Sequence, residues 1–218
     1  MKTVQAPCSS CIRKTKHDVL FETSQQRDEE TRDSYALISC GGCSTVSMGH
    51  QRLWVDDGSI DQAYYPSPVS RKMPSWTFWL TLGLMKNKEE GALGALLMEI
   101  FQAVDGGQYR LAAMGIRALL EQVMIFKIGD LPTFDEKLDE FQKQGYISLI
   151  QRDSMRATLD VGDAAMHRGF RPTEQELSIA LDVVEGVFAP IFGHRAEAEK
   201  LADRVPARAP RPPKKPAE

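Results

Sequence analysis

The sequence predicts a mainly α protein, in which a helical bundle follows a small N-terminal β module. Beyond Pro74 the apolar residues recur with the period of an amphipathic helix, whereas residues 1–55 contain short runs of strand-forming residues. A content of 42% hydrophobic and 26% charged residues excludes collagen, coiled-coil and disordered classes. We therefore expect a zinc ribbon over 1–55, a linker over 56–73, the helical bundle over 74–197 and a basic, proline-rich tail over 198–218.

The β module is predicted from three short runs with strand character, at residues 19–21, 35–38 and 45–48. The segment 24–34 between the first two runs is polar and has no apolar period, so it is expected to form an exposed loop.

The four cysteines fall into two Cys-x2-Cys pairs, Cys8/Cys11 and Cys40/Cys43, which are separated by 28 residues. A two-residue gap lets both thiolates of a pair point at one ion, and two pairs supply the soft tetrahedral ligand set that zinc prefers. With four thiolates, no coordination position is left for water. We therefore expect one structural zinc ion and no catalytic metal.

Two alternatives to this site stay open. The cysteines can be redox dithiols or buried free thiols, although the thioredoxin-like βαβ context of a redox pair is absent from the sequence. His17 and His50 lie close in sequence and can in principle replace a thiolate. Since four cysteines already complete the set, we interpret both histidines as surface groups or as supports of the ligands.

The bundle is predicted from helix starts, stops and apolar stripes. Tyr64–Pro68 contains two prolines and indicates an extended linker. Capping boxes at Thr133 and Thr173, with Glu136 and Glu176 three residues on, mark two helix starts. Helices are expected over residues 76–84, 89–104, 109–128, 133–144 and 148–166, and beyond Thr173, where one stripe holds Leu177, Leu181, Val184, Phe188 and Ile191.

The charge pattern separates the parts. The formal net charge is −3, but the bundle is acidic, residues 1–72 are balanced and the tail is basic. Any nucleic-acid contact is therefore expected at the β module, the tail or the corner formed by His167 and Arg168. The N-terminus lacks the apolar core of a signal peptide, and no apolar stretch approaches the roughly 20 residues that a membrane helix needs. A cytoplasmic protein without a membrane contact is expected.

Two polar groups interrupt the helical part. Arg117 and Glu121 are four residues apart and form either a structural ion pair or a polar pair aimed into a cleft. Asp163 and His167 share a stripe with Arg156 and Asp160, at steps of four, three and four residues. Asp163 can then hold the His167 ring, or His167 simply caps a helix end.

These segments, in this order, resemble the domain-of-unknown-function family 4145. The resemblance rests on the two cysteine pairs, the Tyr-Tyr-Pro linker, Gly115–Glu121 and Gly162–Gly169, and it covers most of residues 8–192. It implies a HEPN-like (higher eukaryotes and prokaryotes nucleotide-binding) bundle that dimerises. The family's usual arginine falls on Leu159, and Asp163 stands where asparagine is usual, which departs from the ribonuclease pattern.

Three functions follow as hypotheses. The first is a non-enzymatic protein that binds nucleic acid, such as RNA, or a protein partner; the resemblance implies that it acts in bacterial defence or stress response. The second is a metal-independent ribonuclease with His167 as general acid and base, and Arg168, Arg156 or Arg117 steadying the phosphate. The third is a structural subunit that forms a homodimer.

Overall fold

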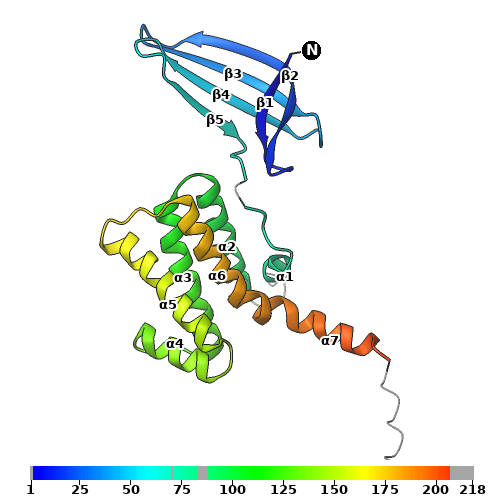
Figure 1. Ribbon diagram of the computed structural model, residues 1–218, viewed down its shortest axis with the longest axis vertical. Helices are drawn as coiled ribbons and strands as arrows, with labels where there is room; N and C mark the ends of the chain where they lie inside the picture. Colours follow the sequence, from blue (N-terminus) through cyan, green and yellow to red (C-terminus); the bar gives the residue numbers. More distant parts are fainter. Residues whose placement is uncertain (1, 70, 83–87, 207–218) are drawn as a thin grey trace, which may run out of the picture.

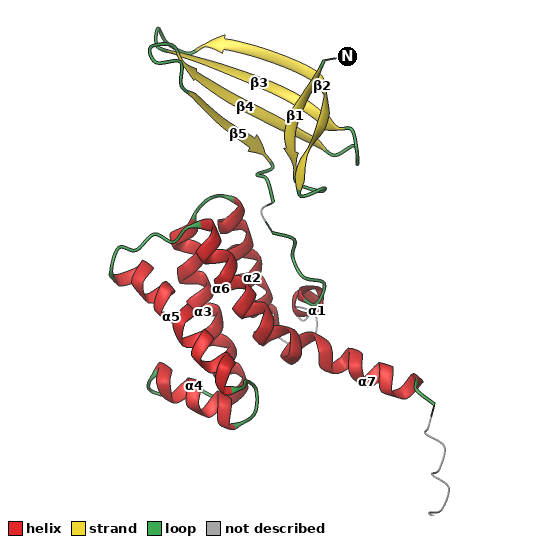
Figure 2. Cartoon of the chain, in the orientation of Figure 1, coloured by secondary structure: helices red, strands yellow, loops and turns green. Residues whose placement is uncertain are grey.

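The protein is an α+β protein, so the prediction of a mainly α fold is wrong. The computed structural model describes residues 2–69, 71–82 and 88–206. Helices make up 51% and strands 23% of the chain. Figure 2 shows that the strands gather in the N-terminal part and the helices follow. The β part is larger than the short runs predicted, because its strands extend through stretches whose residues are mostly polar.

The N-terminal part is one five-stranded antiparallel sheet in which neighbours in sequence are neighbours in space. Figure 1 shows that this sheet curls into a half-barrel. The strands are β1 Thr3–Cys8, β2 Arg13–Gln26, β3 Thr31–Cys40, β4 Val46–Trp54 and β5 Ile60–Tyr65.

Two segments differ from their predicted state. The expected loop at residues 24–34 is strand at both ends, and only a tight turn separates β2 from β3. In that turn Asp28 Oδ1 accepts hydrogen bonds from the backbone N–H groups of Glu30 and Thr31, at 3.0 and 2.7 Å, which closes the hairpin. Strand β5 lies within the expected linker 56–73, so the sheet extends to Tyr65.

The helices begin and end close to the signals in the sequence. Capping boxes are present at Thr133, Ser148 and Thr173, each with its side chain accepting from the backbone three residues on. The elements are α1 Thr77–Leu82, α2 Lys88–Asp105, α3 Tyr109–Ile128, α4 Phe134–Lys143, α5 Leu149–His167, α6 Glu174–Phe188, a π-helical turn Ala189–His194 and α7 Arg195–Arg204.

Helix α3 occupies the centre of the hydrophobic core. Its Leu119, Leu120 and Met124 have no exposed surface, and α2, α4, α5 and α6 pack around it. The closest approach lies between α3 and α5, where a Cβ added to Gly162 would lie 2.5 Å from Arg117 Cβ. Glycine is therefore required there by packing, and the close approach brings the polar residues of α3 and α5 together.

One helical stretch among the described residues, Glu174–His194, is long and apolar enough to cross a membrane, with a mean hydropathy of 1.4. The expectation of a chain without a membrane helix stays a prediction, because length and composition alone define this stretch. The apolar stripe of α6, including Leu177, Leu181 and Val184, lies in the hydrophobic core. A core helix of a folded protein meets the same criterion.

The predicted tail at 198–218 begins inside a helix, because α7 extends to Arg204. Residues 207–218, which carry most of its prolines and basic residues, lie outside the described residues.

Candidate metal centre

The two cysteine pairs form turns of the same backbone geometry. In each, the N–H of the residue after the second cysteine donates to the carbonyl of the first: Ile12 to Cys8 at 2.9 Å and Ser44 to Cys40 at 2.8 Å. Ile12 and Ser44 both have positive φ angles, 53° and 62°, which residues other than glycine rarely adopt. The chain accepts this strain twice because the turn directs two sulfur atoms to one point.

The four sulfur atoms lie within 4.8 Å of one another. Cys8 Sγ is 3.5 Å from Cys43 Sγ, and Cys11 Sγ is 3.9 Å from Cys40 Sγ. Four sulfurs each about 2.3 Å from a central ion are separated by about 3.8 Å in a tetrahedron. All four cysteines are free thiols in a geometry that can bind a metal ion.

The surroundings favour the thiolate form at Cys40 and the thiol form at Cys11. The Thr15 hydroxyl lies 3.2 Å from Cys40 Sγ, and the backbone N–H of Gly42 donates to the same sulfur at 3.4 Å. Together with the Cys43 amide these bonds lower the pKa of Cys40 to about 5. Hydrogen bonds with the Cys43 and Cys8 thiols raise the pKa of Cys11 to about 12. Without a cation, four adjacent thiolates repel one another, so a bound divalent ion would stabilise the fully charged set.

The two nearby histidines have different positions. His17 is 1% exposed, and its Nδ1 lies 3.0 Å from the carbonyl oxygen of Thr15, the residue whose hydroxyl contacts Cys40. His17 therefore contacts the cysteine cluster indirectly, through Thr15. His50 belongs to another group: its Nε2 lies 3.1 Å from Asp33, and its ring stacks on Tyr35 with centroids 4.6 Å apart.

The predicted polar residues of α3 and α5 also meet. Arg117 Nη1 lies 3.8 Å from Glu121, and Arg117 Nε lies 3.4 Å from Asp163 Oδ1. The Arg117 guanidinium also stacks on the Phe134 ring at 4.2 Å. Arg117 is thus held in the seam between α3, α4 and α5 by two carboxylates and one aromatic ring.

A buried lysine that the sequence patterns did not predict lies at the centre of this seam. Lys137 on α4 is buried, and its Nζ lies 2.8 Å from Glu121 and 2.9 Å from Asp130. The bond to Glu121 raises the pKa of Lys137 despite its burial. Its burial could have been predicted from its place on the apolar face of α4, which it shares with Leu138 and Phe141.

His167 and Arg168 lie at the end of α5. The His167 side chain is 64% exposed, and its Nε2 lies 4.0 Å from Asp163 Oδ1, the oxygen that also faces Arg117. Arg168 pairs with Asp160, and Arg156 pairs with Asp135 across the seam. The stripe predicted as one group therefore divides into three contacts: Arg156 with Asp135, Asp160 with Arg168, and His167 with Asp163.

The fold and the cysteine cluster define a two-part α+β protein with a sulfur-only ligand set in its sheet. The chain belongs to the family described as Domain of unknown function (DUF4145), whose model matches residues 98–208, just over half of it. The match includes the polar seam and His167 but begins after the cysteines. No curated protein and no solved structure matches the chain.

Proposed function

We propose that this chain is a non-enzymatic protein that binds single-stranded nucleic acid through a sheet stabilised by one structural zinc ion. Cys8, Cys11, Cys40 and Cys43 would hold the ion, and their sulfur separations of 3.5 and 3.9 Å suit a tetrahedral thiolate site. Thiolates favour zinc over magnesium or calcium, and a complete thiolate set leaves no position for water. When bound, the ion would cross-link the turn between β1 and β2 to the turn between β3 and β4, and would supply no catalysis.

The zinc proposal is tested on purified protein by elemental analysis and by cobalt substitution. One zinc per chain is expected, and cobalt should give the absorption bands of a tetrahedral thiolate complex. Cys40→Ser should abolish both signals, whereas Ser9→Ala, in the turn between Cys8 and Cys11, should keep them. A folded wild-type chain that contains no metal and takes up no cobalt would contradict the proposal.

The nucleic-acid proposal rests on one observation, a cationic cluster beside the metal centre. Arg13, Lys14 and Lys16 are exposed and line one shallow hollow with Gly41 and Gly42. Within the part of the chain that the structure describes, none of the three has an ion pair. The cluster begins two residues after Cys11, so a bound ion would fix the strand that carries these cations. Phosphate groups are the expected partners of such a cluster.

Fluorescence anisotropy with a labelled single-stranded RNA measures this binding at several salt concentrations. The triple variant Arg13→Ala/Lys14→Ala/Lys16→Ala should weaken binding strongly and reduce the magnitude of the salt slope by about 2, since each phosphate contact on a single strand contributes about 0.7. A matched triple variant removes three exposed cations of the helical part and should bind as wild type: Lys88→Ala/Lys143→Ala/Arg171→Ala. Equal affinities of the two triple variants would refute this site.

A second candidate function, RNA cleavage by His167, is favoured by the exposure of His167 beside Asp163 and Arg117. Against it, Arg117 is already engaged by two carboxylates, which reduces its capacity to hold a phosphate. Incubation with labelled RNA decides between the two functions. The non-enzymatic proposal predicts no cleavage; cleavage that is lost in His167→Ala and kept in His194→Ala would establish the ribonuclease.

A further inference from the structure

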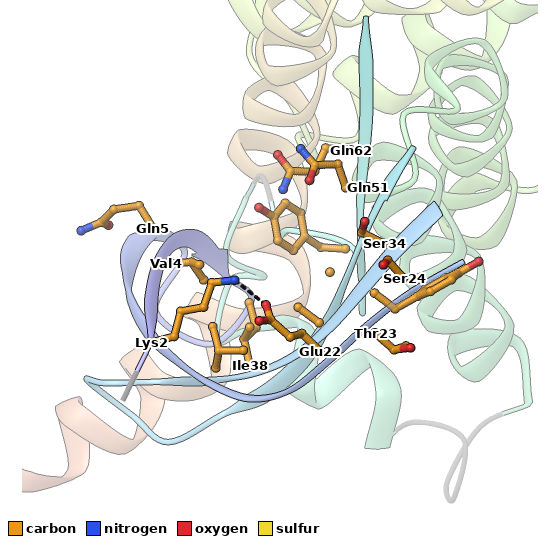
Figure 3. Close-up of a pocket in the computed structure, with 15 residues that line it drawn as sticks. Lys2, Val4, Gln5, Glu22, Thr23, Ser24, Ser34, Ile38, Gln51 and Gln62 are labelled. Carbon is orange, nitrogen blue, oxygen red and sulfur yellow. Dashed lines mark hydrogen bonds and ion pairs between the residues drawn. The ribbon is translucent and has the colours of Figure 1, made fainter. Parts of the chain in front are cut away.

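The concave side of the half-barrel encloses a pocket of about 570 Å³, shown in Figure 3. Small-molecule sites in proteins have volumes of about 300 to 1,000 Å³. None of the four cysteines lines this pocket, so it is separate from the candidate metal centre.

One wall of the pocket is a row of neutral polar side chains. Ser24, Ser34, Gln51 and Gln62 are directly opposite one another on β2, β3, β4 and β5 and line the pocket together. Figure 3 shows the Gln51 and Gln62 side chains lying next to each other. Each side-chain amide offers hydrogen-bond donors and an acceptor, so the two glutamines can bind the edge of a ligand that carries both donors and acceptors.

The next row of register partners combines the aromatic ring of Tyr64 with two small residues, Ala36 and Gly49. Ala36, Gly49 and Tyr64 are register partners on β3, β4 and β5. A Cβ added to Gly49 would lie 3.4 Å from Tyr64 Cε1, so the tyrosine ring lies against the glycine. Since Ala36 and Gly49 fill little space, a planar ligand has room beside the ring.

The pocket carries no net charge. The charged residues that line it are Lys2 and Glu22, whose side chains form an ion pair at 2.5 Å. A phosphate or an ammonium group would have to break this pair without finding another partner in the lining. The chemistry of the pocket therefore favours a neutral, planar ligand with mixed donors and acceptors, and an unpaired nucleobase has these properties.

We infer that this pocket accepts one unpaired base of the strand whose phosphates contact Arg13, Lys14 and Lys16. The inference rests on the proposed nucleic-acid binding. Gln5 on β1 lines both hollows, so this edge strand borders the two. The base stacks on Tyr64, and the amides of Gln51 and Gln62 bind its edge.

The test compares labelled oligonucleotides of equal length and charge: oligo(A), oligo(U) and an abasic strand. Wild-type protein should bind a base-containing strand about tenfold or more tightly than the abasic strand, as stacking on an aromatic ring provides. Tyr64→Ala should abolish this discrimination, and Tyr64→Phe should keep it. Phe21→Ala, which removes an aromatic ring that is 63% exposed, serves as the matched control and should keep it too.

A filling variant, Ala36→Leu, should also abolish discrimination while removing no group that binds the base. Circular dichroism and the zinc content check that each variant is folded. If wild type binds all three strands equally, or if Tyr64→Ala and Ala36→Leu still discriminate, the base pocket is refuted while the cationic cluster stands. If wild type binds none of the strands, the proposed function fails and the pocket with it.

Discussion

Asp33 is a buried carboxylate on a sheet whose surface is otherwise largely open to solvent. Its side chain is 2% exposed and binds Arg52 at 2.8 and 3.2 Å and His50 at 3.1 Å. The bond to Arg52, followed by that to His50, lowers the pKa of Asp33 to about 2. The charged form is thus stabilised by folding, and the group links β3 to β4.

A lowered pKa makes a testable pH dependence. The stabilisation from Asp33 should be complete above the unfolded pKa of about 3.9 and lost as the pH falls through about 2. The difference in thermal midpoint between wild type and Asp33→Asn should therefore be large at pH 6 and shrink towards pH 2. A thiolate-bound metal would also be lost as the pH falls, so the comparison uses only those pH values at which both proteins retain one zinc per chain.

Asp61→Asn is the control, since Asp61 is exposed and faces Arg52 from β5. It should change the midpoint little. A difference between wild type and Asp33→Asn that is the same at pH 6 and at the lowest pH compared would contradict the assignment.

At the scale of single residues, the sequence predicted the cysteine cluster but not Asp33 or Lys137. The spacing of Cys-x2-Cys pairs restricts the sulfur positions locally, so a metal-compatible group could be inferred without the fold. Asp33 and Lys137 each acquire their partners from other strands or helices. Nothing in a polar segment marks which of its charges becomes buried, because that depends on the register.

Among the elements, the helices were predictable, whereas β2, β3 and β4 were predicted only as short runs and β1 and β5 were not predicted. Capping boxes at Thr133 and Thr173 report helix starts through local hydrogen bonds. In β2 and β3, by contrast, the inner face is polar at Ser24 and Ser34 because it lines a pocket. An apolar alternation is therefore missing, and a segment of two long strands resembled a loop.

The contact between α3 and α5 gives a prediction at the element scale. A Cβ at Gly162 would lie 2.8 Å from the carbonyl oxygen of Ala113, which is backbone and cannot move aside. Gly162→Ala should therefore lower the free energy of unfolding by about 1–3 kcal/mol, although alanine is the better helix former. Chemical denaturation followed by the helical circular dichroism signal measures the change.

Gly186 in α6 provides the matched control, because an added Cβ there would meet nothing within 4 Å. Gly186→Ala should raise the free energy of unfolding by about 0.5–1 kcal/mol. If both substitutions change stability in the same direction, the close approach of α3 and α5 is not the reason for Gly162.

In the whole molecule, the two parts differ in what stabilises them. Among the described residues, the fully buried apolar side chains of the sheet are Ala6, Cys8, Ile38 and Cys40. The main hydrophobic core consists of residues of the helical part, from Leu80 to Phe188. So few buried side chains cannot stabilise a sheet of this size, whereas a cross-linking ion can.

Removal of the metal should therefore unfold one part selectively. With a strong chelator under reducing conditions, the amide NMR signals of residues 3–65 should collapse to the narrow range of unfolded chains. The helical circular dichroism signal should remain. Re-addition of zinc should restore the dispersed signals, and magnesium should not. Loss of sheet and helices together, or of neither, would contradict this division.

The meander order of the sheet has a consequence during synthesis on the ribosome. Each strand pairs with its sequence neighbour, and all four cysteines precede residue 44. The sheet therefore needs no residue after Tyr65, and it can close while the helical part is still being translated. The availability of the proposed zinc ion at that moment would set how many nascent chains leave the ribosome with a finished N-terminal sheet.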